Sequence, residues 1–581
     1  MHHPFQCVQL IANENYSDDG ILLAASGPQL YSFSSRNGSM LHKWWPEKSG
    51  SGLIPSVEVG APQPNVRTDS QDAAPLQDRE ESHPEKRRKV SLSLTPDSVN
   101  RPGTEAGLSQ PEQDLSTHID RLPYFTGLAA TSTGSHAVTI TGENKCLRVF
   151  AIEHFGQLRL LSERIMPKRP CALAITADDS TILCGDKFGD VYSLPLVTIV
   201  DRATSTDLEQ INPATQTVFR PAADEGTVHT ARNQRALQNQ RQTASKAIRK
   251  RITEPSCQLL LGHVSLLTDL AAVSFDGHGS RSPSKGNFII TSDRDEHIRV
   301  SRGLPQTHVI EGYCLGHKEF VSRICVPPWQ QTSLISGGGD SMLILWDWTL
   351  FRILQVHDLH EQLAHCVDLE IRKDNDAAPQ DSENCIGRND DSIPPEEFNS
   401  ASLTAVDDLR RPKPERKPEN ENNRNVSGIW AMEISDPTSN TSQRRGDIFV
   451  ALEGVPILFA FHLDDANGLQ FDQALPLKGN VLDVATHKVQ RSLFVSVDNI
   501  HARLSTIQVR DRAAEGETLL QSFYLAPDVE HSEWIEHPSS ETDPVSVINK
   551  HGSFELRDEA LATLHTKLYT LENLRKQANE E

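Results

Sequence analysis

Apolar residues occur along the chain in short runs, some alternating with polar residues and others continuous. Gly, Asp, Asn and Ser residues separate these runs, as in LAATSTGSHAVTITGENKCLRVFAI, CALAITADDSTILCGDKFGDVYSLPL and TSLISGGGDSMLILWDW. Short runs bounded by turn residues at regular intervals are typical of the strands of all-β domains. The pattern therefore predicts an all-β fold between the polar stretches of the chain.

The runs also repeat. Gly262-His263 and Gly316-His317 begin two successive units. A polar stretch at 276–286 lengthens the first unit, and without it the interval approaches the ~40 to 45 residues of a WD propeller blade. The second unit, LGHKEFVSRICVPPWQQTSLISGGGDSMLILWDW, resembles a WD repeat in its Gly-His start, its Ser-Gly-x-x-Asp turn and its terminal Trp-Asp.

This second unit predicts a buried polar network. A histidine in the entry loop, an aspartate in the tight turn, a serine on one strand and a tryptophan on the next can satisfy one another's donors and acceptors. Each of these groups would be costly to bury unpaired. The four residues are His317, Asp340, Ser336 and Trp346.

The preceding unit keeps only part of this pattern. His263 and Asp295 stand at the positions of His317 and Asp340, so we expect them to pair, but Ser301 stands where the tryptophan would be. Other units keep only the rhythm of strand, turn and strand, and together they make seven candidate blades. We expect the first segment, FQCVQLIA, to pair into the last blade, because closing the ring removes exposed sheet edges.

The predicted fold is thus a seven-bladed WD-repeat β-propeller with long disordered insertions and a C-terminal helix. The insertions are rich in Pro, Ser, Gln and charged residues and are too polar to hold a core. Leu561, Leu564, Leu568 and Leu571 give the C-terminal segment one apolar face, which suits a single helix lying on the propeller or on a partner. The expected parts are 1–45 (first blade and closing strand), 46–118 (disordered insertion), 119–199 (blades two and three), 200–255 (polar insertion), 256–371 (blades four and five), 372–425 (acidic disordered insertion), 426–525 (blades six and seven) and 552–578 (amphipathic helix).

Charge and composition exclude several classes of function. The net charge of −22 argues against unaided, non-specific nucleic-acid binding, which depends on neutralising phosphates. No apolar run approaches the ~18 residues of a membrane span, and the N-terminal residues lack the pattern of a signal peptide, so we expect an intracellular protein. The nine cysteines are scattered, with neither a disulfide framework nor a CxxC metal site.

A basic cluster, Lys86-Arg87-Arg88-Lys89, lies inside the first insertion. A compact basic cluster on a flexible acidic chain is typical of a nuclear import signal. The alternative is that these residues are ordinary solvent-exposed charges without a function. We therefore expect a nuclear protein. The similar cluster Arg249-Lys250-Arg251 is a weaker candidate.

The sequence HEQLAH resembles the HExxH motif of zinc proteases, but His360 and His365 are five residues apart instead of four and diverge on a helix. We assign no metal. Gly337-Gly338-Gly339 lies between strands and not before a helix N-terminus, which argues against a phosphate site. We find no convergent catalytic set, so we expect a protein that is not an enzyme and holds no cofactor.

The segment TSDRDEHIRVS is not explained by the repeat pattern. Arg299 stands where the well-formed unit has the apolar Ile344. Its guanidinium must either pair internally, for example with Glu296 or Asp293, or project toward a partner, since arginine suits bidentate capture of a carboxylate.

At this segment the chain resembles a known family, the non-catalytic WD-repeat subunit of eukaryotic tRNA (guanine-7) methyltransferase. The matching stretches are SDRDEHIRVSR (292–302), VIEGYCLGHKEFVSRI (309–324), GDKFGDVY (185–192) and TGENKCLRVF (141–150).

The resemblance implies a scaffold that forms a heterodimer with a catalytic methyltransferase subunit. That partner would carry S-adenosylmethionine and form 7-methylguanosine in tRNA, and tRNA would be reached through the complex. The resemblance places Arg299 toward the partner, with Arg294, His297, Asp186 and Lys187 as further candidates. It implies that Arg299→Glu abolishes the complex and that Arg299→Lys weakens it. The alternatives are a nuclear adaptor that binds peptides in the propeller channel and, less favoured, a propeller enzyme.

Overall fold

The computed structural model divides the chain into two units, Met1–Pro46 with Ile119–Glu581, and Glu47–His118. The residues described are 1–11, 20–46, 123–197, 257–275, 286–364, 424–434, 445–464, 468–510, 518–526, 533–538, 540, 542–556 and 558–576. The predicted import cluster at 86–89, the weaker cluster at 249–251 and His365 lie outside them. Among the described residues, no helix has the length and apolar composition required to cross a bilayer.

The first unit is built from four-stranded antiparallel sheets that follow one another along the chain. The first four are β1–β4 (Cys7–Ile11, Ile21–Ser26, Gln29–Ser34, Met40–Trp44), β5–β8 (Phe125–Ala130, His136–Thr141, Cys146–Ile152, Leu158–Ile165), β9–β12 (Pro170–Ile175, Thr181–Asp186, Asp190–Pro195, Gln258–Gly262) and β13–β16 (Leu267–Phe275, Gly286–Asp293, Ile298–Arg302, Ile310–Cys314).

Three more sheets complete the described set. They are β17–β20 (Val321–Cys325, Ser333–Gly338, Met342–Asp347, Arg352–Asp358), β21–β24 (Val426–Ile434, Arg445–Leu452, Ile457–Asp464, Gly468–Pro476) and β25–β28 (Asn480–His487, Ser492–Asp498, Leu520–Ala526, Glu533–Glu536). The named helices are η1 (His154–Gly156), α4 (Pro544–His551), α5 (Asp558–Leu568) and η3 (Leu571–Leu574).

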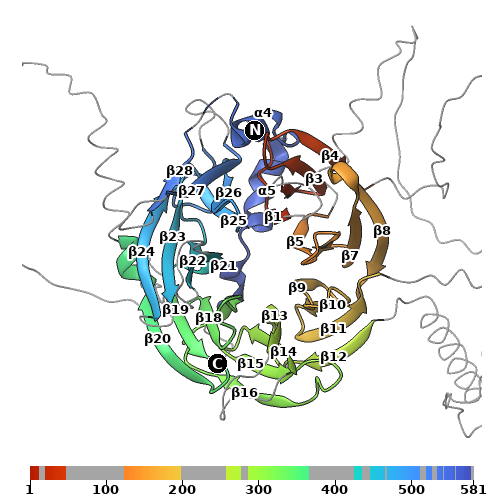
Figure 1. Cartoon of the computed structure of the whole chain (residues 1–581), viewed down its shortest axis with the longest axis vertical. Helices are drawn as coiled ribbons and strands as arrows, with labels where there is room; N and C mark the ends of the chain where they lie inside the picture. Colours follow the sequence, from red (N-terminus) through yellow and green to blue (C-terminus); the bar gives the residue numbers. More distant parts are fainter. Residues whose placement is uncertain are drawn as a thin grey trace, which may run out of the picture. The chain divides into compact units, whose positions relative to one another are not determined.

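These seven sheets are the blades of a β-propeller, as the sequence predicted. Figure 1 shows them around a central channel, with the first strand of each blade innermost. Apolar side chains of neighbouring blades pack between the sheets. Ile290 and Val300 of blade four, for example, share one cluster with Ile344 and Trp346 of blade five. Burial of these side chains is the main force that holds blade to blade.

A β-bulge recurs on the innermost strand of blades two to seven. One residue of that strand is skipped in the pairing with the second strand. The skipped residues are Thr126, Cys171, Thr268, Ser322, Ser427 and Leu482. Three of them donate a hydrogen bond to a carbonyl of the next blade: Cys171 to Leu267, Thr268 to Val321 and Ser322 to Val426. The bulges thus turn small side chains into ties between blades.

The ring closes differently from the sequence prediction. FQCVQLIA was expected to pair into the last blade, and this is wrong, because β1 pairs with β2, from Cys7 opposite Ala25 to Ile11 opposite Ile21. Blade seven takes all its strands from the C-terminal part of the chain. The joint between blades seven and one is instead held by side chains. The Asp483 carboxylate accepts a hydrogen bond of 2.8 Å from the Val8 amide, and an apolar cluster lies alongside it.

The C-terminal segment is also less regular than the single helix expected over 552–578. Residues near the two ends of the chain pair first: the His3 amide donates to the Phe554 carbonyl, and the Leu556 amide donates to the Met1 carbonyl. Helix α5 follows and packs Leu561 and Leu564 against Tyr124 and other residues of the ring. Residues 566–576, here called the C-terminal strap, then cross the middle of the ring (Figure 1).

The closing joint should give the protein a characteristic pH dependence. Burial raises the pKa of Asp483 to about 6, against the hydrogen bonds from Val8, Val484 and Trp430 that favour its charged form. A carboxyl whose pKa is higher in the folded state contributes stability below its unfolded pKa and loses it as the pH rises through the folded pKa.

We therefore expect the unfolding free energy of the native chain, relative to Asp483→Asn, to fall by up to about 3 kcal/mol between pH 4 and pH 7. Chemical denaturation at several pH values measures this difference. Glu361→Gln, at an exposed position, is the control. If the difference in unfolding free energy between the native chain and Asp483→Asn does not change with pH, the raised pKa of Asp483 is contradicted.

Candidate partner-binding site

The polar network predicted in blade five is present. His317 Nδ1 lies 3.0 Å from Asp340 Oδ2, and its Nε2 lies 2.7 Å from Ser336 Oγ. Trp346 Nε1 donates to the same hydroxyl at 2.8 Å. Burial alone would raise the pKa of Asp340, but the hydrogen bond from His317 and the amides of Lys318 and Met342 outweigh it and lower the pKa. This confirms the prediction from the Gly-His and Trp-Asp pattern.

Blade four has a related network with a different aspartate. His263 Nδ1 lies 3.1 Å from Asp293 Oδ2, and its Nε2 lies 2.6 Å from Thr291 Oγ1. The expected pairing of His263 with Asp295 is therefore wrong. The turn carries an aspartate at both positions, and Asp293 is the one whose second oxygen accepts the amides of Asp295 and His297.

Arg299 contacts Ser301, the residue that stands in blade four where blade five has Trp346. Its side chain is almost buried, with 8% of the residue exposed. Its Nε donates to Ser301 Oγ at 2.9 Å, and its Nη1 donates to the Gly262 carbonyl at 3.0 Å. Burial lowers the pKa of the guanidinium from its usual value. Internal pairing, one of the two readings open from the sequence, therefore occurs, although with Ser301 and Gly262 instead of acidic residues.

The remaining sequence candidates separate into buried and exposed groups. Arg294 donates from Nε to the Leu574 carbonyl at 2.8 Å and is engaged by the C-terminal strap. Asp186 is buried; its Oδ1 accepts the Phe188 amide at 2.7 Å, and its Oδ2 has no hydrogen-bond partner among the described residues. Lys187 is half-buried, and burial together with Arg169 lowers its pKa. Of the five partner-binding candidates, Arg299 included, only His297 is exposed.

Three loops carrying these residues lie side by side at the rim of blades three and four. The His263 amide donates to the Gly189 carbonyl at 2.8 Å, which joins the turn before β11 to the entry loop of blade four. The Arg294 amide donates to the Leu266 carbonyl at 2.9 Å, which joins that loop to the turn before β15. The loops thus form one continuous surface.

This surface carries apolar side chains that the sequence analysis missed. Phe188 is 61% exposed, Leu315 is 59% exposed and Val264 is fully exposed. The imidazole of His297 lies 6.2 Å from the ring of the exposed Tyr313. We call the following set the rim patch: the exposed residues Phe188, Val264, His297, Tyr313 and Leu315, together with the half-buried Asp295 and Glu296. The sequence held one signal for this surface: Phe188 in GDKFGD and Val264 in LGHV are apolar residues in turns, where polar residues are usual.

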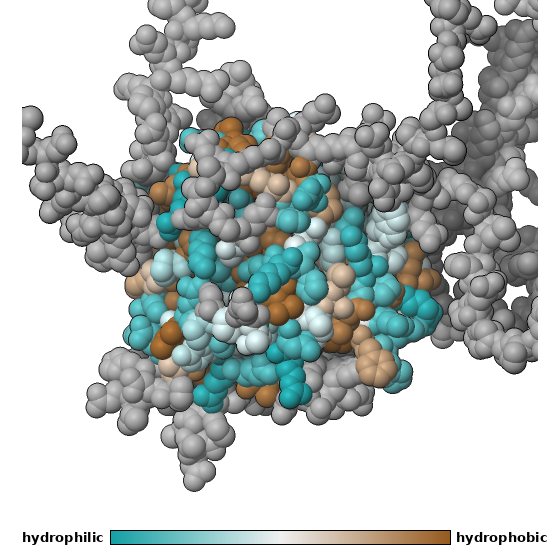
Figure 2. Space-filling model, turned by 90° about the horizontal axis from the view of Figure 1, so that it is seen from above, coloured by the Kyte–Doolittle hydropathy of each residue, from teal (hydrophilic) through white to brown (hydrophobic). Residues whose placement is uncertain are grey.

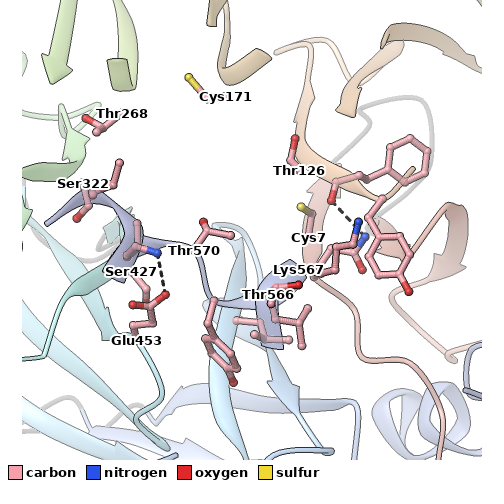
Figure 3. Close-up of a pocket in the computed structure, with 18 of the residues that line it drawn as sticks. Cys7, Thr126, Cys171, Thr268, Ser322, Ser427, Glu453, Thr566, Lys567 and Thr570 are labelled. Atoms are coloured by element: carbon pink, nitrogen blue, oxygen red, sulfur yellow. Dashed lines mark hydrogen bonds between the residues drawn. The ribbon is translucent and has the colours of Figure 1, made fainter. Parts of the chain in front are cut away.

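The central channel offers a different surface. Figure 3 shows Cys7, Thr126, Cys171, Thr268, Ser322 and Ser427 facing it from the surrounding blades. Thr566, Lys567 and Thr570 of the C-terminal strap line the same space. A peptide bound at this place would therefore have to share it with the chain's own C-terminal segment.

Figure 2 shows one edge of the ring, seen from above the view of Figure 1. On that face hydrophilic and hydrophobic residues are interspersed. Single exposed apolar residues are normal on a protein surface, whereas neighbouring ones on adjoining loops point to an interaction site.

Comparison with known proteins identifies relatives over nearly the whole length. Residues 22–523 match the family model described as the tRNA methyltransferase TRM82 WD40 domain. Two curated relatives are tRNA (guanine-N(7)-)-methyltransferase non-catalytic subunits. The one from Coccidioides immitis is 38% identical and covers 97% of this chain and 96% of its own. The one from Aspergillus clavatus is 34% identical and covers 99% and 97%. A solved structure titled "Structure of U3-55K" is similar with a TM-score of 0.43 and 11% identity over 90% of this chain and 95% of that one.

The position of Arg299 predicts a stability effect in the isolated protein. Arg299→Glu places an unpaired carboxylate beside the Gly262 carbonyl and should lower the unfolding free energy by about 3 to 5 kcal/mol. Arg299→Lys keeps the charge but not both hydrogen bonds, so we expect a loss of about 1 to 2 kcal/mol. Denaturant unfolding of the isolated chain measures both.

Arg352→Glu is the control, because Arg352 is exposed and its 3.6 Å pair with Asp347 contributes little. Unchanged stability in Arg299→Glu would show that the internal hydrogen bonds are unimportant. Loss of a complex in that variant does not by itself locate an interface.

Proposed function

Because this chain belongs to the TRM82 family of non-catalytic subunits of tRNA (guanine-N(7)-)-methyltransferase, we propose that its propeller binds the catalytic subunit through the rim patch. The observation that carries the proposal is the group of exposed apolar side chains at this rim: Phe188 and Val264 lie on adjoining loops of blades three and four, and Tyr313 and Leu315 lie at the end of β16, where Tyr313 is close to His297 of the 293–297 turn. Those loops include the segments GDKFGD and SDRDEHIRVS.

The chemistry of the rim patch suits a protein partner with basic character. Val264 and Phe188 can be desolvated in the middle of an interface, where apolar and aromatic residues contribute most. Asp295 and Glu296 also belong to the rim patch, but Lys576 pairs with both, so the negative charge that attracts a basic partner comes mainly from the chain's net charge of −22. An enzyme that grips tRNA is expected to be positively charged, so the two charge distributions are complementary.

In this proposal the chain acts by support and not by chemistry. The catalytic subunit carries S-adenosylmethionine, and tRNA is bound mainly by that subunit. A rigid propeller that binds only the folded, active form of its partner stabilises that form by mass action. The rim loops are suited to this because backbone hydrogen bonds tie them to one another and to the blades.

A reconstitution tests the proposal. The catalytic subunit with the native chain should form 7-methylguanosine in tRNA from S-adenosylmethionine far faster than either protein alone. Val264→Lys should weaken binding at least about tenfold, because it places a charge at an apolar contact and repels a basic partner. Titration of the catalytic subunit with each variant, read by activity and by size exclusion, gives the affinity.

Val489→Lys is the matched control, because Val489 is 70% exposed and belongs to blade seven. Full-strength binding by Val264→Lys would refute the placement at the rim patch. Absence of any complex with the native chain would refute the function itself and favour a peptide-binding adaptor.

We propose in addition that the protein acts in the nucleus and that Lys86, Arg87, Arg88 and Lys89 are its import signal. Replacing all four by alanine in the full-length chain should move a fluorescent fusion from the nucleus to the cytoplasm. The same replacement of Arg249, Lys250 and Arg251, the weaker candidate, should leave the fusion in the nucleus. Unchanged nuclear signal in the first variant would contradict the assignment.

A further inference from the structure

The C-terminal strap connects blades on opposite sides of the ring. Its Lys567 pairs with Glu143 of blade two at 2.5 Å. Further along, Arg575 Nη2 donates to the Gly339 carbonyl of blade five at 3.0 Å, and Lys576 Nζ lies 3.1 Å from Glu296 Oε1 of blade four. A segment of this length therefore links parts of the ring that do not touch one another directly.

The middle of the strap is anchored firmly. Tyr569 is nearly buried, and its hydroxyl donates to Asp498 of blade seven. Burial first, and then the charge of Asp498, raise the pKa of Tyr569 well above its usual value, so the phenol stays a donor. The Leu571 amide donates to Glu453 Oε1 of blade six at 3.1 Å, a hydrogen bond drawn in Figure 3.

The far end of the strap contacts the turn at 293–297, which belongs to the rim patch. Arg294 donates from Nε to the Leu574 carbonyl at 2.8 Å and from Nη2 to the Arg575 carbonyl at 3.2 Å. Lys576 also lies 3.5 Å from Asp295 Oδ1. Backbone carbonyls of the strap thus accept hydrogen bonds from the arginine of this turn, and the Lys576 side chain of the strap pairs with its acidic residues.

The turn requires such support. Glu296 adopts a φ of +70°, a left-handed conformation that costs a residue with a side chain about 1 kcal/mol or more. The Asp293 carboxylate supports it from within by accepting the amides of Asp295 and His297. The strap supports it from outside, because Lys576 holds the Glu296 side chain.

We propose that the C-terminal strap is a positioning element that holds the 293–297 turn in the shape in which the rim patch binds its partner. This rests on the proposed function for the identity of the partner. The strap occupies the channel mouth as an internal ligand. Because the C-terminal segment contacts both the joint that closes the ring and the 293–297 turn, closure of the ring is linked to the shape of the partner-binding surface.

The test compares two truncations of the full-length protein. A chain ending at Glu572 keeps the anchors Tyr569 and Leu571 but lacks Leu574, Arg575 and Lys576. A chain ending at Lys576 keeps every strap contact described above and is the matched control. Lys576→Glu, which opposes Asp295 and Glu296, is a second variant that leaves the chain length intact.

Two measurements separate the outcomes. Hydrogen exchange of the isolated protein reports the order of the turn; we expect the 293–297 amides to exchange about tenfold faster in the Glu572 truncation and in Lys576→Glu, with blades one and two unchanged. Affinity for the catalytic subunit should fall about fivefold, since only a fraction of molecules would hold the competent turn. The Lys576 truncation should match the native chain in both.

Unchanged exchange at 293–297 in both variants would overturn the proposal, even if affinity falls, because the strap would then act by direct contact. Faster exchange with unchanged affinity would equally overturn it, since the shape of the turn would not matter to the partner. If the native chain binds no catalytic subunit, the proposed function fails. In that case the proposed role toward the partner fails with it, and the exchange result still decides whether the strap orders the turn.

Discussion

The joint between the last and the first blade is the constraint on which the rest of this structure depends. Each blade is made of consecutive strands, so no strand is shared across that joint. Packing and hydrogen bonds alone must hold the ring closed there. Asp483 reaches across to the Val8 amide, and residues near the two ends of the chain pair with each other. The C-terminal segment then continues from this joint across the channel to blade four, so one stretch of chain contacts both the closing joint and the turn at 293–297.

The polar networks inside the blades show how the repeat can decay without loss of the fold. Blade five keeps the complete set around Trp346. Blade four loses the tryptophan, and Arg299 bridges Ser301 and Gly262. Blade three has no histidine in its entry loop, and Asp186 keeps an unpaired oxygen. The bulges of the innermost strands recur in these blades, so the ties between blades survive where the network within a blade does not.

Local pattern was sufficient for the fold class, the number of blades and the network of His317, because each depends on spacing within one unit. Local pattern was not sufficient to choose between Asp293 and Asp295, because both stand in one tight turn and the backbone geometry decides which carboxylate faces His263. The closing strand was misplaced because the prediction required a shared strand to close the ring, whereas β1 pairs with the next strand in the chain and side chains hold the joint with blade seven. The exposed apolar residues of the rim patch and the C-terminal strap were missed because exposure and long-range docking are properties of the assembled ring.

The central claim is that the loops of blades three and four form the surface on which the catalytic subunit rests. Hydrogen exchange of the full-length chain, measured with and without that subunit, tests it most directly. The account predicts slower exchange on binding at residues 186–190, 263–266, 293–297 and 313–315, with little change in the rims of blades one, two, six and seven. Protection confined to the channel mouth, or to the outer strands of other blades, would contradict it.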